Sequence, residues 1–369
     1  MKILVTGYNG FIGKNLVAEL KNKGYTDLLL FGRENTEEQL SEYAGKCQFV
    51  FHLAGVNRPE REEEFWQGNK ELTRKLLDAL TASQSKAPVL MTSSIQAECS
   101  NPYGASKRES EELLFSYEKK SGNQVYAYRL PNVFGKWSRP DYNSVIATFC
   151  HHISRHEEIT VSSRENVMNL VYIDDVVNEL IAAMEGKANR IGAFCQVPVT
   201  YQTTLGWLAD TLYSFQEGRN NLQVPDMGNE LEKKLYSTWL SYLPENAFSY
   251  ALNRNTDDRG SFTEFIRTAN RGQVSVNVSK PGVVKGNHWH NTKNEKFLVV
   301  KGQGVIRFRK VGSNEVIEYP VSGERLEVVD IPVGYTHNIE NTGMEDMITV
   351  MWANEAFDPN HPDTWYEEV

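Results

Sequence analysis

Apolar and polar positions follow two different rhythms along this chain. Over residues 1–243, short apolar runs alternate with longer amphipathic stretches, as in folds whose buried parallel strands alternate with helices. The pattern predicts strands at Ile3–Thr6, Leu28–Phe31, Phe49–Leu53, Val89–Ser93 and Val125–Leu130, and helices at Phe11–Lys23, Leu72–Ala82, Gly104–Lys120 and Asn229–Leu243. We therefore expect an α/β Rossmann-type, doubly wound parallel sheet in this part.

The rhythm changes after residue 243. Residues 274–279 alternate strictly between apolar and polar. Further β-rich runs follow at 296–300, 304–309, 315–319, 326–331 and 347–352, separated by glycine, proline or asparagine. This spacing is typical of an antiparallel sandwich or a small barrel. We expect two domains, an α/β domain at 1–243 and an all-β domain at 244–369.

Composition narrows the class of protein. The 369 residues include 39 Lys and Arg against 48 Asp and Glu, a net charge of -9, so no nucleic-acid partner is expected. No apolar run reaches the ~18 residues of a membrane span, and we expect no membrane insertion. The four cysteines show no CxxC spacing, which argues against a disulfide framework or a thiolate metal site. The first residues lack the pattern of a signal peptide, so the cytoplasm is the expected location.

A glycine-rich stretch, Thr6 to Gly13 (TGYNGFIG), lies between the first strand and the first helix. Glycines there permit a tight turn and close approach to a pyrophosphate, and the helix N-terminus offers free N–H groups. A glycine-rich turn without a ligand is the alternative. About 20 residues on, Arg33 offers a guanidinium to a 2′-phosphate, which favours NADPH over NAD. A solvated surface arginine beside Glu34 is the other interpretation.

Tyr103 and Lys107 open the helix predicted at 104–120. Their four-residue spacing puts both on one helical face. We expect the lysine ammonium to lower the pKa of the tyrosine from its usual ~10, which would make it a proton donor near neutral pH. Ser93 and Ser94 end the preceding strand, where ligand crevices of α/β sheets form, and a serine hydroxyl there could bond a substrate carbonyl.

Together these motifs resemble the extended short-chain dehydrogenase/reductase family, as do HLAG at 52–55, Asn69, RLPNVFG at 129–135 and VYIDDV at 171–176. The resemblance implies a proton donor at Tyr103, a ribose-binding lysine at Lys107 and a carbonyl-orienting serine at Ser94, with Ser93 as the substitute. The nine residues from Ser94 to Tyr103 are fewer than is typical of the family. The implied cofactor-binding residues are Gly7, Tyr8, Asn9, Gly10, Phe11, Ile12, Gly13, Arg33, Leu53, Ala54 and Lys107. Nucleotide sugars are the implied substrates.

The β-rich part carries candidate metal ligands. His288 and His290 are two apart, so on a strand both face the same side, and a turn can bring Glu295 back to that side. With His337 they offer three imidazoles and one carboxylate, which suit zinc, nickel or iron(II), and zinc is favoured here. Histidines satisfied within a core are the alternative.

This part resembles the cupin superfamily. Residues 282–302 follow its first motif, G-x5-HxH-x4-E-x6-G, and residues 332–341 follow part of the second, in which Leu326 replaces the leading glycine. The stretch DRGSFTE at 258–264 resembles the opening of deoxysugar 3,5-epimerases of the cupin type. The cluster of His151, His152 and His156 is interpreted as a solvated helix face rather than a metal site.

A reductase fused to a metal-binding cupin resembles a family of bifunctional capsular polysaccharide enzymes. The resemblance implies a homodimer that acts on a UDP-linked 4-keto-6-deoxy-N-acetylhexosamine. We expect epimerisation at C3 in the cupin domain and then reduction of the C4 ketone with NADPH, which gives a product of the L-talose type. Lys285 and Glu327 are candidate bases at C3, because they lie near the motifs. Two alternatives are a single-activity reductase with a structural or ligand-binding cupin, and a sugar-binding protein that retains NADP without turnover.

Overall fold

The computed structural model describes residues 1–252, 255–257, 260–262, 266, 273–355 and 360–369. Of the DRGSFTE stretch, Asp258, Arg259, Thr263 and Glu264 lie outside the described residues. The chain forms two compact units, Met1–Ser144 with Met168–Thr203, and Val145–Val167 with Thr204–Val369. The second unit thus includes residues 145–167 and 204–243, which the helix–strand pattern groups with the first domain.

A seven-stranded sheet forms the centre of the first unit, in the order β2-β1-β3-β4-β5-β9-β8. All neighbours are parallel except β8 and β9. The strands are β1 (Ile3–Thr6), β2 (Leu28–Phe31), β3 (Phe49–His52), β4 (Val89–Ser94), β5 (Val125–Leu130), β8 (Arg190–Ile191) and β9 (Phe194–Cys195). A smaller sheet joins β6 (Asn132–Phe134), β7 (Val167–Tyr172) and β10 (Tyr201–Thr204).

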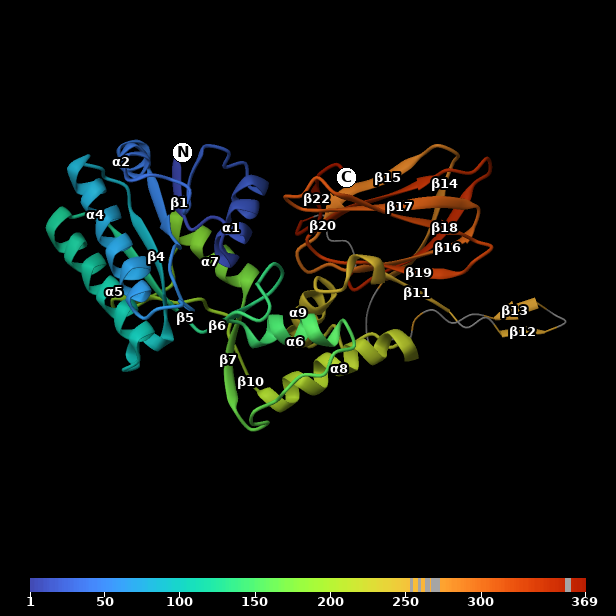
Figure 1. Ribbon diagram of the computed structural model, residues 1–369. Coiled ribbons are helices and arrows are strands. Elements are labelled where there is room, and N and C mark those ends of the chain that lie inside the picture. Colours follow the sequence, from blue (N-terminus) through green and yellow to red (C-terminus); the bar gives the residue numbers. More distant parts are fainter. Residues whose placement is uncertain (253–254, 258–259, 263–265, 267–272, 356–359) are drawn as a thin grey trace. The chain divides into compact units, whose positions relative to one another are not determined.

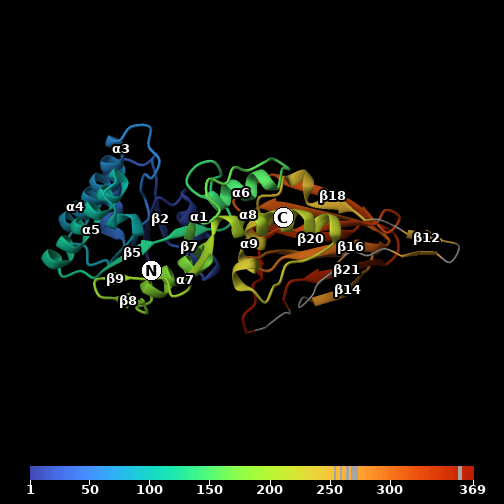
Figure 2. The same ribbon diagram turned by 90° about the horizontal axis from the view of Figure 1, so that it is seen from below.

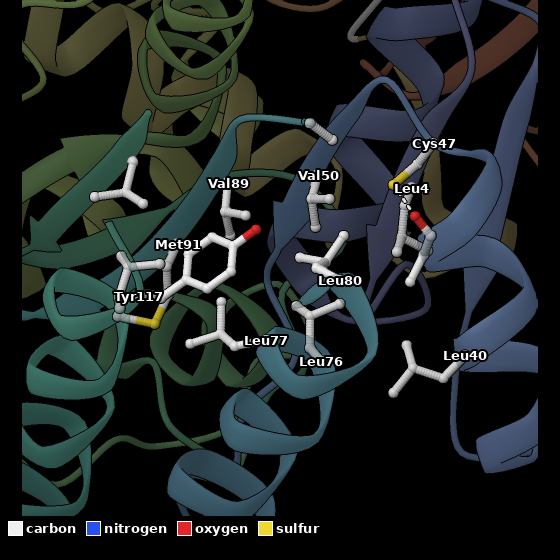
Figure 3. Close-up of a cluster of buried hydrophobic side chains, with 14 of the residues drawn as sticks. Leu4, Leu40, Cys47, Val50, Leu76, Leu77, Leu80, Val89, Met91 and Tyr117 are labelled. Atoms are coloured by element: carbon white, nitrogen blue, oxygen red, sulfur yellow. Dashed lines mark hydrogen bonds between the residues drawn. The ribbon is translucent and has the colours of Figure 1, made fainter. Parts of the chain in front are cut away.

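Helices cover both faces of the large sheet (Figures 1 and 2). One layer holds α2 (Glu37–Lys46), α4 (Leu72–Ala82) and α5 (Pro102–Ser121), and the other holds α1 (Phe11–Asn22) and α7 (Ile173–Met184). The short α3 (Glu63–Phe65) continues into a π-helical turn at Trp66–Glu71 and then into α4. Between the sheet and the first layer, Leu4, Val50 and Val89 meet Leu76 and Leu80 in a fully buried core (Figure 3). Burial of these side chains fixes the strand ends that carry the candidate site.

The second unit is built on two antiparallel sheets of five strands. One sheet contains β11 (Ser249–Ala251), β14 (Gln273–Ser279), β16 (Glu295–Lys301), β19 (Glu327–Ile331) and β21 (Met347–Ala353). The other contains β15 (Val284–Trp289), β17 (Gln303–Lys310), β18 (Val316–Ser322), β20 (Tyr335–Asn341) and β22 (Trp365–Tyr366). The ring centroids of Phe297 and His337, one from each sheet, lie 5.9 Å apart, so the sheets share one interior.

Among the described residues, this unit also contains three α-helices and two short strands that pair antiparallel. They are α6 (Val145–Ile153), α8 (Leu205–Asn221) and α9 (Glu230–Leu240), with β12 (Asn255–Asp257) and β13 (Gly260–Phe262). The predicted fold class, a parallel α/β sheet followed by an all-β part, is confirmed. Within the part of the chain that the structure describes, no helix is both long and apolar enough to cross a membrane.

Candidate functional site

The glycine-rich turn is formed where backbone segments come too close for side chains. Gly7 has a φ of 71°, and a Cβ on it would lie 2.6 Å from the backbone nitrogen of Ala54. A Cβ on Gly13 would lie 2.3 Å from the carbonyl oxygen of Gly7. Gly10 caps α1 without a side chain, so the first N–H groups of the helix stay available to an anion. The turn thus fits a pyrophosphate.

Three further predicted cofactor residues, Arg33, Leu53 and Ala54, follow the strands β2 and β3. Leu53 and Ala54 follow β3, and the backbone N–H of Leu53 donates to the carbonyl of Thr6 at 3.2 Å. Glu34 follows β2, and its carboxylate accepts a hydrogen bond from the hydroxyl of Tyr8 at 2.6 Å. This carboxylate is adjacent to Arg33, so the choice between NADPH and NAD stays a prediction.

Ser94, Tyr103 and Lys107 are positioned by β4 and α5. Asn101 caps α5 by accepting the N–H of Gly104 at 2.7 Å, which places Tyr103 in the first turn and Lys107 in the second. Ser94 ends β4 and is hydrogen-bonded to Tyr103. Ser93 is 5% exposed and donates to the carboxylate of Glu111 at 2.5 Å. Ser93 is thus buried against a carboxylate, whereas Ser94 is only partly buried and reaches Tyr103, so Ser94 is the better candidate of the two serines.

Burial, rather than the charge of Lys107, has the largest effect on the pKa of Tyr103. It raises the pKa of Tyr103 above its usual value, and the hydrogen bond with Ser94 offsets only part of the shift. The lowering of this pKa that the Tyr103–Lys107 spacing predicts is therefore not found. Burial also lowers the pKa of Lys107 to about 8, and its ammonium donates to the carbonyl of Thr92 at 3.1 Å.

A polar shell around Lys107 includes two residues from neighbouring elements. Asn69 lies in the π-helical turn, donates to the backbone of Val56 and to the hydroxyl of Ser106, each at 2.9 Å, and holds the loop after β3. His52, whose role the sequence did not suggest, is within 2.7 Å of the Thr6 hydroxyl, and burial lowers its pKa to about 3. π-helical turns often occur at functional sites.

The four predicted metal ligands converge in the second unit. His288 comes from β15, His290 follows it, Glu295 begins β16 and His337 lies on β20. One ligand atom from each lies within 4.8 Å of all the others. The nearest carboxylate oxygen of Glu295 is 3.6 Å from Nε2 of His290 and 3.5 Å from Nε2 of His337. The bend that returns Glu295 to the histidines is the one expected from the sequence.

The protonation and hydrogen bonding of the group fit a cation. Burial and the two neighbouring imidazoles lower the pKa of His288 to about 3, so it is neutral near pH 7. Burial alone would raise the pKa of Glu295. His290 and His337 outweigh this effect and hold the pKa of Glu295 well below its usual range. Nε2 of His290, Nε2 of His337 and Oε2 of Glu295 are buried without a hydrogen-bond partner among the described residues. Neutral imidazoles and an ionised carboxylate are the forms that bind metal.

Asp363 is a residue of this site that the sequence analysis missed. Its backbone carbonyl accepts a hydrogen bond from Nδ1 of His290, which leaves Nε2 as the ligand atom. Its carboxylate accepts the N–H groups of Asn291, Thr292 and Lys293 at distances of 2.9, 2.6 and 2.7 Å. Asp363 lies 68 positions after Glu295 along the chain, and no spacing pattern links the two.

The other candidate residues have contacts of their own. The ammonium of Lys285 donates to the side chain of Asn277 at 2.7 Å, and Glu327 accepts from Arg325 at 2.6 Å. Near α6, His152 contacts Glu157 at 2.5 Å. Nδ1 of His156 is 2.6 Å from the amide of Gln216. The group of potential metal ligands found among the described residues is the one at His288.

Family models match both parts of the chain. Residues 3–193 match the NAD dependent epimerase/dehydratase family, and residues 255–365 match the polysaccharide biosynthesis C-terminal domain. The chain belongs to the NAD dependent epimerase/dehydratase family.

Full-length relatives extend this assignment. The chain is 47% identical, over 99% of its length and 98% of the relative, to the UDP-2-acetamido-2,6-beta-L-arabino-hexul-4-ose reductase of Pseudomonas aeruginosa. It is 55% identical to the capsular polysaccharide assembling protein CapF from Staphylococcus aureus, with 100% of both chains covered and a TM-score of 0.69. The expected resemblance to capsular polysaccharide enzymes is confirmed by these matches. The UDP-glucose 4-epimerase of Thermotoga maritima, 24% identical over 58% of this chain and 82% of its own, shares the fold with a TM-score of 0.52.

Proposed function

We propose that this protein is a bifunctional nucleotide-sugar enzyme of capsular polysaccharide precursor synthesis. Its β-rich domain, a cupin at 244–369, epimerises C3 of a UDP-linked 4-keto-6-deoxy-N-acetylhexosamine. Its reductase domain at 1–243 then reduces the C4 ketone with NADPH to a UDP-2-acetamido-2,6-dideoxy-hexose of the L-talose type. The main support is that one chain carries both a serine–tyrosine–lysine group and a convergent set of four metal ligands. The name of the Pseudomonas relative supports the substrate.

The order of the two steps follows from carbonyl chemistry. A C–H bond beside a ketone is acidic, because the charge left by deprotonation moves onto the carbonyl oxygen. Removal of the C3 proton and its return to the other face inverts that centre. After reduction of the C4 ketone the C3 proton is no longer acidic. Epimerisation therefore precedes reduction.

In the reductase domain the protein supplies a proton and orientation. Bound NADPH supplies the hydride for C4. The phenol of Tyr103 donates its proton to the carbonyl oxygen, and burial keeps that proton in place at neutral pH because it raises the pKa. The hydroxyl of Ser94 donates a hydrogen bond that orients the same oxygen. Lys107 would bind the ribose of the cofactor, and Arg33 would bind its 2′-phosphate.

In the β-rich domain His288, His290, Glu295 and His337 would hold a divalent cation, with zinc favoured by the donor set of three nitrogens and one oxygen. Such a cation would supply positive charge for the oxygen that becomes negative during deprotonation. Lys285 and Glu327 remain the candidate bases. We further propose that the protein acts in the cytoplasm as a homodimer.

The second candidate function is a single-activity nucleotide-sugar 4-ketoreductase whose metal only stabilises the β-rich domain. One observation favours it. Four side chains converge on the site, which is enough to fill the tetrahedral coordination of a structural zinc ion, whereas catalytic zinc sites keep one position for water or substrate.

Analysis of the reaction product tests the proposal. The holoenzyme is incubated with the UDP-linked keto sugar and NADPH, and the product is identified by NMR on a sample whose bound metal is also measured. We expect a C4 alcohol with an inverted C3 centre. A C4 alcohol with the original C3 configuration would establish the single-activity reductase instead, and the absence of NADPH consumption would contradict both functions.

A further inference from the structure

Glu111 is a buried carboxylate close to the residues of the proposed reductase site. It is 2% exposed and lies on α5 one helical turn after Lys107. One oxygen accepts the hydroxyl of Ser93 at 2.5 Å and Nε of Arg129 at 3.0 Å, and the other accepts the terminal guanidinium nitrogen of Arg129 at 2.7 Å. A buried charge is costly, and a carboxylate remains ionised in such a place only when charged and polar partners surround it.

These contacts tie three elements together at one point. Ser93 is the neighbour of Ser94 on β4, and it pairs in register with Arg129 on β5. Tyr103 and Lys107 both belong to α5, which carries Glu111. The carboxylate therefore connects the strand end that bears the serine to the helix that bears the tyrosine and lysine.

Glu111 also acts on the charge of Lys107. Burial lowers the pKa of Lys107 to about 8, and the negative charge of Glu111 opposes this shift. The remaining titratable or charged groups around this position are His52 on β3, Tyr103 on α5, Arg129 on β5, Glu98 next to Arg129, and Tyr142, which faces Tyr103. Since burial keeps His52 neutral near pH 7 and Arg129 is positive, Glu111 is the buried negative charge in this set.

We propose that Glu111 is a positioning residue of the reductase site, which fastens the end of β4 to α5 and keeps the buried Lys107 charged. This inference rests on the proposed reductase function. It assigns to the carboxylate two separable effects, one geometric through Ser93 and one electrostatic on Lys107, neither of which requires contact with substrate or cofactor.

The test measures kcat/KM for NADPH-dependent reduction of the UDP-linked keto sugar between pH 6 and pH 9.5. For Glu111→Gln, which keeps the shape of the side chain and removes its charge, we expect the alkaline limb to move down by about one pH unit. At pH 9 this shift corresponds to an about tenfold lower kcat/KM, with a smaller loss at pH 6.5. For Glu111→Asp, which keeps the charge but is too short to hold Ser93, we expect a lower kcat with the alkaline limb unmoved.

Glu98→Gln is the matched control, because Glu98 also binds Arg129, at 2.7 Å, but has a side chain that is 73% exposed. It should leave the pH profile unchanged. A loss in Glu111→Gln that is equal at every pH would show a merely structural residue and overturn the inference, as would a wild-type profile in both Glu111 variants. Thermal unfolding of each variant identifies any that fail to fold. If Glu111→Gln fails to fold, Glu111→Asp still tests whether the carboxylate positions Ser93. An inactive wild-type enzyme would instead contradict the proposed function itself.

Discussion

Burial controls the chemistry of individual residues in both units. It raises the pKa of Tyr103, so this phenol keeps the proton that a reduction needs. It lowers the pKa of Lys107 to about 8, so the ammonium is present at neutral pH and lost as the pH rises past that value. It lowers the pKa of His288 to about 3, so this imidazole is in the neutral form that can bind a metal. These opposite directions follow from one cause, since burial disfavours whichever form carries the charge.

Replacing Tyr103 with phenylalanine removes the proposed proton donor and little else. Because general acids contribute about 10²–10⁴-fold, we expect NADPH consumption with the keto sugar to fall by that factor. Hydrogen exchange at C3 should continue, since it uses the other site. Tyr117→Phe is the control on the same helix, where the hydroxyl accepts a hydrogen bond from Asn123 at 2.7 Å. Loss of both activities in Tyr103→Phe would contradict independent sites.

Replacing Glu295 with glutamine keeps the size of a metal ligand but removes its charge. In the wild type, excess zinc should stabilise the fold, by about 2.7 kcal/mol at a concentration a hundred times the Kd. We expect a much smaller rise in Tm with Glu295→Gln, measured by thermal unfolding with and without zinc. Glu340→Gln is the control, because Glu340 pairs with Arg307 at 2.6 Å and is not among the ligands. An equal zinc response in wild type and Glu295→Gln would refute the assigned ligand.

At the scale of elements, the strand β22 supports the loop from His290 to Lys293, which begins with a proposed metal ligand. β22 pairs with β15, with Trp365 opposite Trp289 and Tyr366 opposite His288. Asp363, just before β22, binds the loop from His290 to Lys293. The C-terminal segment therefore fixes the orientation of a ligand that it does not itself supply.

The substitution Asp363→Asn should weaken the metal site without touching a ligand. It removes the charge that accepts three backbone N–H groups, and changes to such outer partners typically lower metal affinity about 10–100-fold. Competition with a chelator measures the affinity. Glu368→Gln, in the same segment and bonded to Tyr366 at 3.0 Å, should leave affinity unchanged. Wild-type affinity in Asp363→Asn would show that the segment only closes the sheet.

Regular apolar patterns made several elements predictable from sequence. The predicted strands Ile3–Thr6, Leu28–Phe31 and Val125–Leu130 and the helix Leu72–Ala82 match the observed bounds, because the strands are short apolar runs and the helix has a spaced apolar face. The helix α2 was not predicted, since its sequence, EEQLSEYAGK, buries only Leu40 and Ala44. Local patterns thus identify elements whose apolar positions are numerous enough to show a strand or helix spacing.

Site residues were predictable where chemistry depends on local spacing. The distances along the chain between His288, His290 and Glu295 gave a metal group that the structure brings together. The contacts of Asp363 and His52 join distant segments, and no local pattern reports them. The pKa of Tyr103 was predicted in the wrong direction because spacing shows the neighbouring charge but not the extent of burial.

For the whole molecule, the proposed function requires that one ketone serve two chemistries in turn. In this proposal, the first unit holds the nucleotide cofactor and a proton donor, and the β-rich unit holds a cation; the chain is similar over its full length to a capsular polysaccharide assembling protein. Both units can act on the same sugar only if its carbonyl group activates the neighbouring C–H bond.

Deuterium incorporation in the absence of NADPH tests this claim most directly. The metal-loaded enzyme is incubated with the UDP-linked keto sugar in D2O, and NMR follows the proton at C3. We predict that deuterium replaces this proton at a rate proportional to the enzyme concentration, and that Glu295→Gln largely abolishes the exchange. A C3 proton that persists in the presence of metal-loaded enzyme, while added NADPH is consumed normally, would contradict it.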